Sequence, residues 1–366
     1  MNREPLGLED FVRQRMRVEI AERSAYETFP SVGRIKLDAM ENPYIWPAAI
    51  QKKWLLTLRE IELNRYPDST GRELCADIRS WGCLSDSESI LLGNGSDELI
   101  QMIVMALGGF DRPVLAPEPT FGMYKFIAEA TGCPFIGVPL TENFLLDRDR
   151  LLREIDEHDP SCIFLAYPNN PTGNLFDFET INAVIKRANG LVIVDEAYYP
   201  YSGKTFIKEL QEHDHLAILR TFSKLGLAGL RLGFLAGPHP WLAEINKVRL
   251  PYNISVLTQA SARFALSQDL WFQKQAGKIC AERARLYNDL QSLPGIKVYP
   301  SDANFFLLRL LKDNADKVTD RLFERKIVIK NLNGQHENLQ ECLRVTIGTP
   351  AENDKFLEEL SAVLTP

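Results

Sequence analysis

The chain has 366 residues, a formal net charge of −7 and 45% hydrophobic residues. This length and composition are typical of a globular protein with two domains or one large α/β domain. A mildly acidic chain has no electrostatic attraction to DNA or to an anionic membrane, so we expect neither as a partner. No window approaches about 18 uninterrupted apolar residues, the length that a membrane-spanning helix needs.

The sequence indicates no signal peptide, no disulfide framework and no metal site. The N-terminus, MNREPLGLED, mixes both charges and does not read as a signal peptide. The six cysteines are scattered without a C-x-x-C pair, which argues against a disulfide framework or a zinc site. His213 and His215 flank Asp214; a metal site is one interpretation, and an exposed loop after a helix ending near Gln211 is the favoured one. We therefore expect a cytoplasmic protein with reduced thiols and no metal.

In chain order, an amphipathic helical arm is predicted at residues 6–23 and a capped helix at 68–82. From about residue 88 to 240, short apolar runs alternate with helical patterns, which predicts parallel βαβ units. The runs are SILLG, PVLA, CIFLAY, LVIVD, AILRT and LGFLAG.

The rest of the chain predicts a second, smaller unit. Residues 240–290 are helix-rich, and strands mixed with helices follow at IKVYP, NFFLLRL, KIVIKN and CLRVTIG. We expect an α/β fold with a mostly parallel sheet in a large domain, plus a smaller α+β domain. The predicted division is 1–65 (arm and part of the small domain), 66–255 (large domain) and 256–366 (small domain).

Polar loops follow the predicted strands, where ligands bind in open α/β sheets. GNGSDELI places Ser96 and Asp97 just before a helix, whose free amides suit an anion such as phosphate. The alternative is that one of these side chains simply caps the helix. In YPNNPTG (167–173), prolines on both sides of two asparagines fix a loop that can aim an amide, or form an ordinary turn.

Three charged residues carry the chemical argument. Asp195 ends the apolar run LVIVD, where a carboxylate needs a partner such as a protonated ring nitrogen, unless it is simply a surface acid. Lys224, in TFSKLGLAGLRLGF, becomes a nucleophilic amine if an apolar site lowers its pKa. Arg231 presents a planar charged fork to phosphate, with the hydroxyls of Thr221 and Ser223 beside it. Together these groups predict pyridoxal 5′-phosphate (PLP) as cofactor.

These motifs resemble the fold-type I PLP-dependent enzymes of the aspartate aminotransferase superfamily, and within it the histidinol-phosphate aminotransferases. The resemblance spans nearly the whole chain, and further motifs that carry it are ENPY (41–44), NRYPD (64–68), PEPTFGMY (117–124), VDEAY (194–198) and CLRVTIGTPAEN (342–353). It implies a three-layer large domain and transamination between histidinol phosphate and 2-oxoglutarate in histidine biosynthesis. It also implies a homodimer with shared active sites.

The resemblance assigns roles by position. Lys224 would bond the cofactor aldehyde and move the proton, and Asp195 would pair with the ring nitrogen. Asn170 and Tyr198 would hydrogen-bond the phenolic oxygen, and Phe121 would stack on the ring. The catalytic residues are thus Lys224, Asp195 and Tyr198, and the other cofactor residues, mostly around the phosphate, are Gly95, Ser96, Asp97, Thr221, Ser223, Arg231 and, from a neighbouring subunit, Tyr66.

The residues expected to bind the substrate differ in part from the family pattern. Arg344 resembles the arginine that grips the acidic end of the substrate, and Tyr44 lines the same pocket. Lys330 stands where relatives often place a second arginine, so the charge is kept but not the bidentate fork. Ile45 and Trp46 replace a frequent Gly-Pro, and Trp46 either reshapes the pocket or packs in the core near the small domain.

Other functions remain open at this point. The same framework suits an aromatic amino-acid aminotransferase or a threonine-phosphate decarboxylase. A PLP-binding regulator would need a DNA-binding module, and none is visible before ENPY. A nucleotide-binding protein would need a Walker or G-x-G-x-x-G motif, which the sequence lacks.

Overall fold

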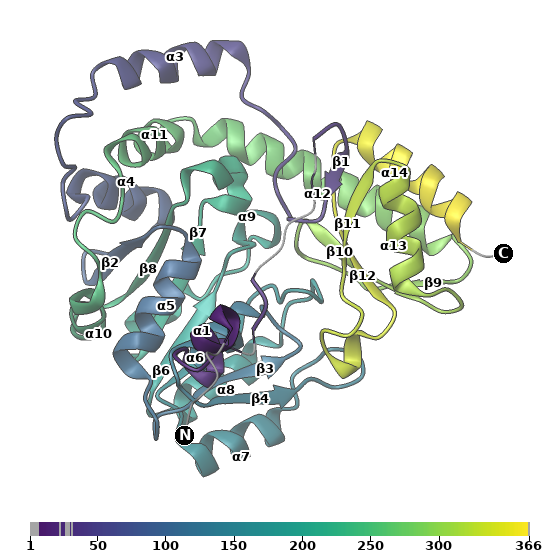
Figure 1. Ribbon diagram of the computed structural model, residues 1–366. Coiled ribbons are helices and arrows are strands. Elements are labelled where there is room, and N and C mark those ends of the chain that lie inside the picture. Colours follow the sequence, from purple (N-terminus) through teal and green to yellow (C-terminus); the bar gives the residue numbers. More distant parts are fainter. Residues whose placement is uncertain (1–6, 22, 26–29, 31, 365–366) are drawn as a thin grey trace.

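The computed structural model describes residues 7–21, 23–25, 30 and 32–364. The ribbon forms two lobes: the larger one contains most of the blue and teal elements, and the smaller one contains the yellow elements and ends at the C-terminus (Figure 1). The two lobes correspond to two separate sheets.

The larger lobe is built on a seven-stranded sheet with the order β2-β8-β7-β6-β5-β3-β4. The pairs from β4 through β3, β5 and β6 to β7 are parallel, whereas β8 is antiparallel to β7 and β2. The strands are β2 (Glu88–Gly93), β3 (Val114–Glu118), β4 (Phe135–Pro139), β5 (Cys162–Ala166), β6 (Leu191–Asp195), β7 (Leu216–Thr221) and β8 (Gly233–Pro238).

Helices cover both faces of this sheet. Successive strand residues point to opposite faces; thus Ile163 and Val192 belong to one buried cluster, and Phe164 and Ile193 to another. The first cluster includes residues of α4 (Arg72–Gly82), α7 (Arg148–His158), α8 (Phe178–Arg187) and α11 (Val256–Leu266). The second includes residues of α5 (Ser96–Leu107), α6 (Met123–Ala130) and α10 (His239–Ile245). The predicted α/β class with a three-layer large unit is confirmed.

The smaller lobe has a five-stranded sheet with the order β1-β11-β12-β10-β9. Its first strand comes from near the N-terminus and pairs in parallel with β11, whereas the other pairs are antiparallel. The elements are β1 (Ile35–Leu37), β9 (Ile296–Val298), β10 (Phe305–Leu310), α13 (Ala315–Glu324), β11 (Ile327–Asn331), β12 (Cys342–Thr346) and α14 (Pro350–Val363).

Helix α12 (Asp269–Gln291) connects the two lobes (Figure 1). Phe272 near its start packs in a core cluster of the larger lobe, whereas Leu286 and Leu290 pack in the core of the smaller one. Helix α11 contacts α4 and α3 (Ala48–Arg59). Residues just after 255 therefore still touch the larger lobe, and the division at that residue stays a prediction.

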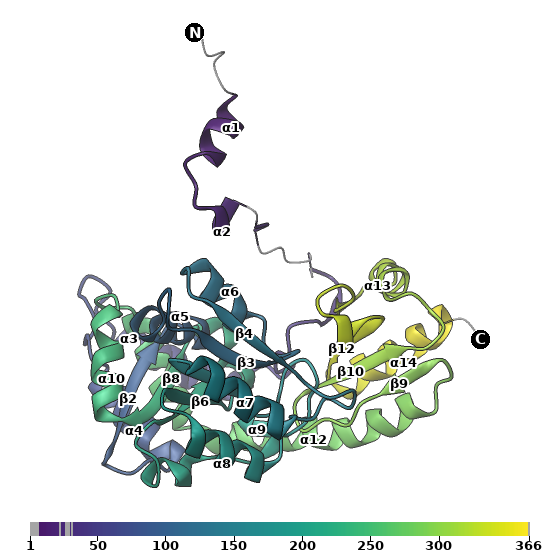
Figure 2. The ribbon, with the colours of Figure 1, turned by 90° about the horizontal axis from the view of Figure 1, so that it is seen from below.

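The predicted N-terminal arm contains two short helices, α1 (Leu8–Arg13) and α2 (Val18–Ala21). Helix α2 contacts α6, and α1 projects away from both sheets (Figure 2). Residues 6 and 22 of the predicted arm lie outside the described residues. In the part of the chain that the structure describes, no helix combines the length and apolar character needed to cross a membrane.

The predicted helix at 68–82 begins at Arg72, because Asp68 organises the turn before it. The Asp68 carboxylate accepts hydrogen bonds from the backbone amides of Thr70 at 3.0 Å and Arg72 at 2.9 Å. These bonds occupy amides that a helix start leaves without partners.

Candidate active site

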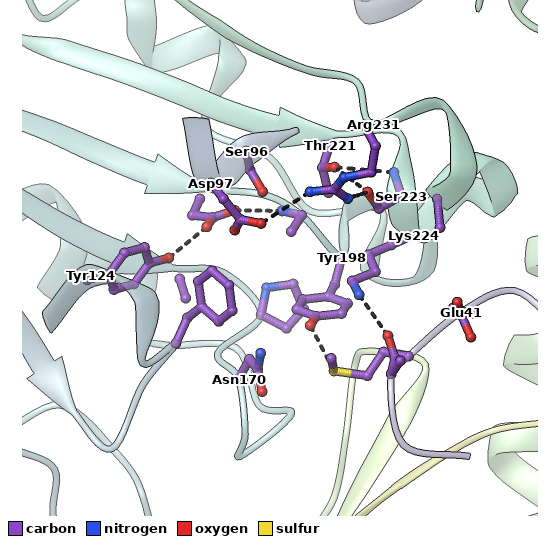
Figure 3. A pocket seen from close by; sticks show the side chains of 18 residues that line it. Glu41, Ser96, Asp97, Tyr124, Asn170, Tyr198, Thr221, Ser223, Lys224 and Arg231 are labelled. Carbon is purple, nitrogen blue, oxygen red and sulfur yellow. Dashed lines mark hydrogen bonds and ion pairs between the residues drawn. The ribbon is translucent and has the colours of Figure 1, made fainter. Parts of the chain in front are cut away.

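A cavity of about 230 Å³ lies at the edge of the large sheet where its parallel strands end (Figure 3). Ala166, Asp195 and Thr221 end the neighbouring strands β5, β6 and β7 and all line it. Residues 39–41, which follow β1 of the smaller lobe, also line it. Ten predicted site residues meet here: Ser96, Asp97, Phe121, Asn170, Asp195, Tyr198, Thr221, Ser223, Lys224 and Arg231.

Lys224 lies in a short π-helical turn after β7, Ser223–Leu227. Its Nζ donates a hydrogen bond of 2.9 Å to the carbonyl oxygen of Ala39, and the Tyr201 hydroxyl donates one of 2.5 Å to the carbonyl oxygen of Lys224. Burial and, after it, the positive charge of Arg344 lower the pKa of Lys224 to about 8. A useful share of the amine is therefore neutral near neutral pH, as a nucleophile or base requires.

Asp195 is a buried carboxylate held by two hydrogen bonds. Its Oδ2 accepts one from the Tyr124 hydroxyl at 2.6 Å, and its Oδ1 accepts one from the backbone amide of Ala197 at 3.0 Å. Burial raises the pKa of Asp195 to about 6. Neither hydrogen-bond donor is a cation, so a cationic ring nitrogen in the cavity would supply the charge that this carboxylate needs.

Hydroxyl groups and a guanidinium gather at the end of the cavity near β7. Arg231 donates from Nη1 to the Ser223 hydroxyl at 3.4 Å, and its Nη2 lies 3.3 Å from Asp97 Oδ2. The Thr221 hydroxyl donates to the Ser223 hydroxyl at 3.0 Å. These donors suit the oxygens of a phosphate group.

The start of α5 adds backbone amides to the same end. Gly95 precedes α5 with a φ of 86°, and a Cβ at this position would lie 2.7 Å from Nη2 of Arg231. The close approach and the backbone conformation both require glycine. No side-chain hydrogen bond caps α5. The alternative in which Ser96 or Asp97 caps this helix is therefore wrong.

Asn170, Tyr198 and Phe121 line the cavity between these groups. The Tyr198 hydroxyl donates to Met40 Sδ at 3.0 Å, and burial raises the pKa of Tyr198, which keeps this hydroxyl protonated. Asn170 is 4% exposed, and its Oδ1 accepts a hydrogen bond from Arg344. The buried loop at 167–173 thus aims an amide, as the first of its two interpretations predicts.

The three predicted substrate residues lie outside the cavity lining. Arg344 nevertheless reaches the edge of the cavity, because its Nη1 donates to Asn170 at 2.6 Å and its Nη2 to the carbonyl oxygen of Asp38 at 2.9 Å. Lys330 pairs with Arg344 across β11 and β12, and burial, followed by the charge of Arg344, lowers the pKa of Lys330. Tyr44 instead packs beside Lys278, whose Nζ lies 4.8 Å from the ring centroid.

Two other aromatic residues have different surroundings. Tyr66 is 80% exposed and stacks on Tyr252, with ring centroids 4.4 Å apart. Its reach into a neighbouring subunit stays a prediction. Trp46 contacts Trp54 at 5.7 Å, as well as Phe264 and Phe272. Trp46 is half-buried and lies outside the cavity lining, so packing is the alternative that the structure shows, but the core on which it packs is that of the larger lobe and not the one expected near the small domain.

The segment with His213 and His215 is a turn before β7, after a 3-10 helix that ends at Gln211. His215 Nε2 lies 2.7 Å from the carbonyl oxygen of Ile185. Within the described ranges, no group of three His, Cys, Asp or Glu side chains could hold a metal ion.

Sequence reasoning missed several groups of the site. Tyr124 is part of the motif PEPTFGMY but has no role assigned from sequence. Ala39 contributes only a backbone carbonyl, Met40 a thioether and Glu41 a carboxylate that lies across from Lys224 (Figure 3). Glu41 belongs to the motif ENPY, so this motif is the sequence feature that could have identified it as a site residue.

Comparisons with known proteins agree with this geometry. The family model for aminotransferase class I and II matches residues 34–360. Histidinol-phosphate aminotransferase 2 of Nitrosococcus oceani is 51% identical over 353 residues, which are 96% of this chain and 98% of the relative. Histidinol-phosphate aminotransferase 1 of Ralstonia nicotianae is 44% identical, over 98% of this chain and 96% of the relative. The crystal structure of the histidinol-phosphate aminotransferase from Clostridium acetobutylicum superposes with a TM-score of 0.83 at 26% identity, over 90% of this chain and 98% of that chain.

The chain belongs to the class I and II aminotransferase family. The fold-type I architecture predicted from its motifs is confirmed. Within the family, these curated relatives carry the name that the sequence resemblance indicates, histidinol-phosphate aminotransferase.

Proposed function

We propose that this protein is a PLP-dependent transaminase that exchanges the amino group of histidinol phosphate with 2-oxoglutarate, in histidine biosynthesis. The observation that carries the proposal is the meeting of Lys224, Asp195 and Arg231 in one cavity. They supply an amine with a pKa lowered to about 8, a buried carboxylate without a cationic donor, and a guanidinium beside hydroxyl groups. The aldehyde, ring nitrogen and phosphate of PLP match these three groups.

Bound PLP supplies an aldehyde that takes up amino groups and a ring that accepts electrons. Lys224 would provide the amine that holds this aldehyde and, once released, would take the proton from the substrate Cα and deliver it to the former aldehyde carbon, as transamination requires. Asp195 keeps a proton on the ring nitrogen, because an ionised carboxylate stabilises the adjacent positive charge. Asn170 and Tyr198 orient the phenolic oxygen, and Phe121 covers a face of the ring.

At the other end of the cavity, Arg344 binds the acidic group of each substrate. A guanidinium binds a carboxylate or a phosphate in the same bidentate way, so Arg344 serves glutamate in one half-reaction and histidinol phosphate in the other. Lys330 adds a second positive charge beside it. Histidinol phosphate carries a doubly charged group, for which two cations are appropriate.

The cofactor is tested by absorbance and chemical labelling. The native enzyme should have a visible cofactor band that borohydride abolishes, and mass spectrometry of the reduced protein should place the label on Lys224. A colourless protein that takes up no PLP would refute the proposal.

The substrate is tested by steady-state rates with histidinol phosphate, phenylalanine, tyrosine and threonine phosphate, each with a suitable acceptor. Histidinol phosphate should have the highest kcat/KM. Activity with the aromatic amino acids alone would indicate an aromatic aminotransferase. Carbon dioxide released from threonine phosphate would indicate a decarboxylase.

The proposed enzyme is a homodimer in which Tyr66 completes the phosphate site of the neighbouring subunit. Large apolar side chains are exposed around it: Leu63, 70% exposed, is three residues away in the sequence, and Leu250, 70% exposed, is two residues from Tyr252, on which Tyr66 stacks. Such side chains are typical of a protein interface. Inactive Lys224→Ala and impaired Tyr66→Ala proteins, unfolded and refolded together, should regain about a quarter of wild-type activity, because a mixed dimer has one complete site. No regain would contradict a shared site.

The proposed compartment is the cytoplasm. All six cysteines are free thiols in the structure, which fits a reducing environment. The three-part domain division given above is likewise retained as a proposal. Limited proteolysis followed by mass spectrometry would locate the boundaries.

A further inference from the structure

Asp195 receives a buried hydrogen bond that the proposed mechanism does not use. Tyr124, the second residue of α6, donates its hydroxyl to Asp195 Oδ2 at 2.6 Å (Figure 3). Its ring stacks on Phe164 of β5, with centroids 4.7 Å apart, and meets the edge of Phe121 at 5.5 Å. Tyr124 is 0% exposed. Packing therefore holds the hydroxyl in one place.

In the hydrogen bond between Tyr124 and Asp195, Tyr124 is always the donor. Burial, followed by the charge of Asp195, raises the pKa of Tyr124 well above its usual range, so the hydroxyl stays protonated and donates. Asp195 Oδ1 accepts from the amide of Ala197. Each carboxylate oxygen thus has one donor from the protein, and the side chain still lines the cavity. Both donors favour the ionised carboxylate, whereas burial favours the protonated one.

We propose that Tyr124 is a positioning residue that keeps the Asp195 carboxylate ionised and oriented toward the cofactor ring nitrogen. This inference rests on the proposed function, because it requires a nitrogen-containing ring in the cavity. Without the hydroxyl, Asp195 becomes more basic and takes the proton from the ring nitrogen. A ring without that proton is a poorer electron acceptor.

Tyr124→Phe tests the proposal, because it removes the hydroxyl and keeps the ring between Phe164 and Phe121. Tyr299→Phe is the matched control: Tyr299 is 9% exposed, packs on Phe144 at 5.0 Å and lies outside the cavity lining. Thermal unfolding of both variants without cofactor establishes that they fold. The affinity of each apoprotein for PLP is then measured by titration between about pH 5 and 8.

The expected result is a shift in pH dependence. PLP affinity falls on acidification as Asp195 takes up a proton, and in Tyr124→Phe this fall should occur about one pH unit higher than in the wild type. Near pH 6 the variant should therefore bind PLP about fivefold more weakly. Tyr299→Phe should follow the wild-type curve.

A cofactor analogue distinguishes an effect of Tyr124 on the charge of Asp195 from an effect of Tyr124 on packing alone. In 1-deazapyridoxal 5′-phosphate a C–H group replaces the ring nitrogen, so an ionised Asp195 gives no benefit. Tyr124→Phe should bind this analogue at least as tightly as the wild type. Equal weakening toward both ligands, or unchanged PLP binding at every pH, would overturn the role of Tyr124. A wild-type protein that binds no PLP would overturn the proposed function as well.

Discussion

Replacing Lys224 with methionine is expected to abolish transamination and to raise the free energy of unfolding of the protein without cofactor. The buried amine has a pKa of about 8, against 10.5 for an ordinary lysine. Each pKa unit corresponds to about 1.4 kcal/mol, so the charged amine costs the fold about 3 kcal/mol. Methionine has a similar length and no charge, and it adapts to irregular apolar space.

Two effects reduce this gain. The Lys224 side chain borders the cavity, where water screens part of the charge. Methionine also cannot donate to the carbonyl oxygen of Ala39, and the loss of such a hydrogen bond costs about 1 kcal/mol. We therefore expect Lys224→Met to be more stable than the wild type by about 1–2 kcal/mol near pH 7.

The pH dependence isolates the contribution of the charge. Between about pH 8 and 10.5 the unfolded chain holds a proton on Lys224 that the folded chain has lost, so wild-type stability gains from this group as the pH rises. The advantage of Lys224→Met should be complete below pH 8 and reverse toward pH 10.5, where only the loss of the hydrogen bond to Ala39, about 1 kcal/mol, remains. Urea unfolding of both apoproteins at one protein concentration measures it, with Lys274→Met on the exposed surface of α12 as control. An advantage of equal size near pH 7 and pH 10, or none near pH 7, would refute the reasoning.

Three further substitutions test the site and its support. Gly95→Ala places a Cβ 2.7 Å from a guanidinium nitrogen at a positive φ, so PLP affinity in an equilibrium titration should fall at least about tenfold, whereas Gly229→Ala, with nothing within 4 Å, should leave it unchanged. Glu196→Gln removes the charged partner of Arg220, whose side chain is 3% exposed, and should lower the unfolding free energy by about 3 kcal/mol; a loss well below 1 kcal/mol in urea unfolding would contradict this. Lys330→Arg supplies a bidentate donor and should lower the KM for histidinol phosphate with little change in kcat; an unchanged KM would place the substrate phosphate elsewhere.

The sequence predicts the strands best where both faces of the sheet are covered. All residues of β5, β6 and β7 are buried, so these strands are nearly continuous apolar runs. The edge strand β4 is mostly half-buried and ends in a proline, and no strand is predicted there.

That ten of the predicted site residues would line one cavity could be foreseen for a related reason. Parallel strands end at one edge of the sheet, so polar residues that follow successive strands must lie close together. The residues that the smaller lobe adds to the cavity have no comparable feature in the sequence. Ala39 contributes a backbone carbonyl, which every residue type has. Tyr124 is visible in the sequence, but its hydrogen bond to Asp195 depends on how α6 packs against β5.

The groups assigned to chemistry also connect the two lobes across the cavity. Lys224 of the larger lobe donates to the carbonyl of Ala39, and Arg344 of the smaller lobe donates to Asn170. Lys224 would leave the Ala39 carbonyl when it bonds to a cofactor aldehyde, and Arg344 would leave Asn170 when it binds the acidic group of a substrate. Binding must therefore replace interlobe hydrogen bonds by ligand contacts, so part of the intrinsic ligand affinity is spent on this exchange. The cofactor would remove only the Lys224 contact, whereas a substrate would also remove the Arg344 contact. The lobes would therefore be joined by different hydrogen bonds in the cofactor-bound and substrate-bound states. The populations of these two states would then depend on how strongly the acidic group of the substrate binds Arg344.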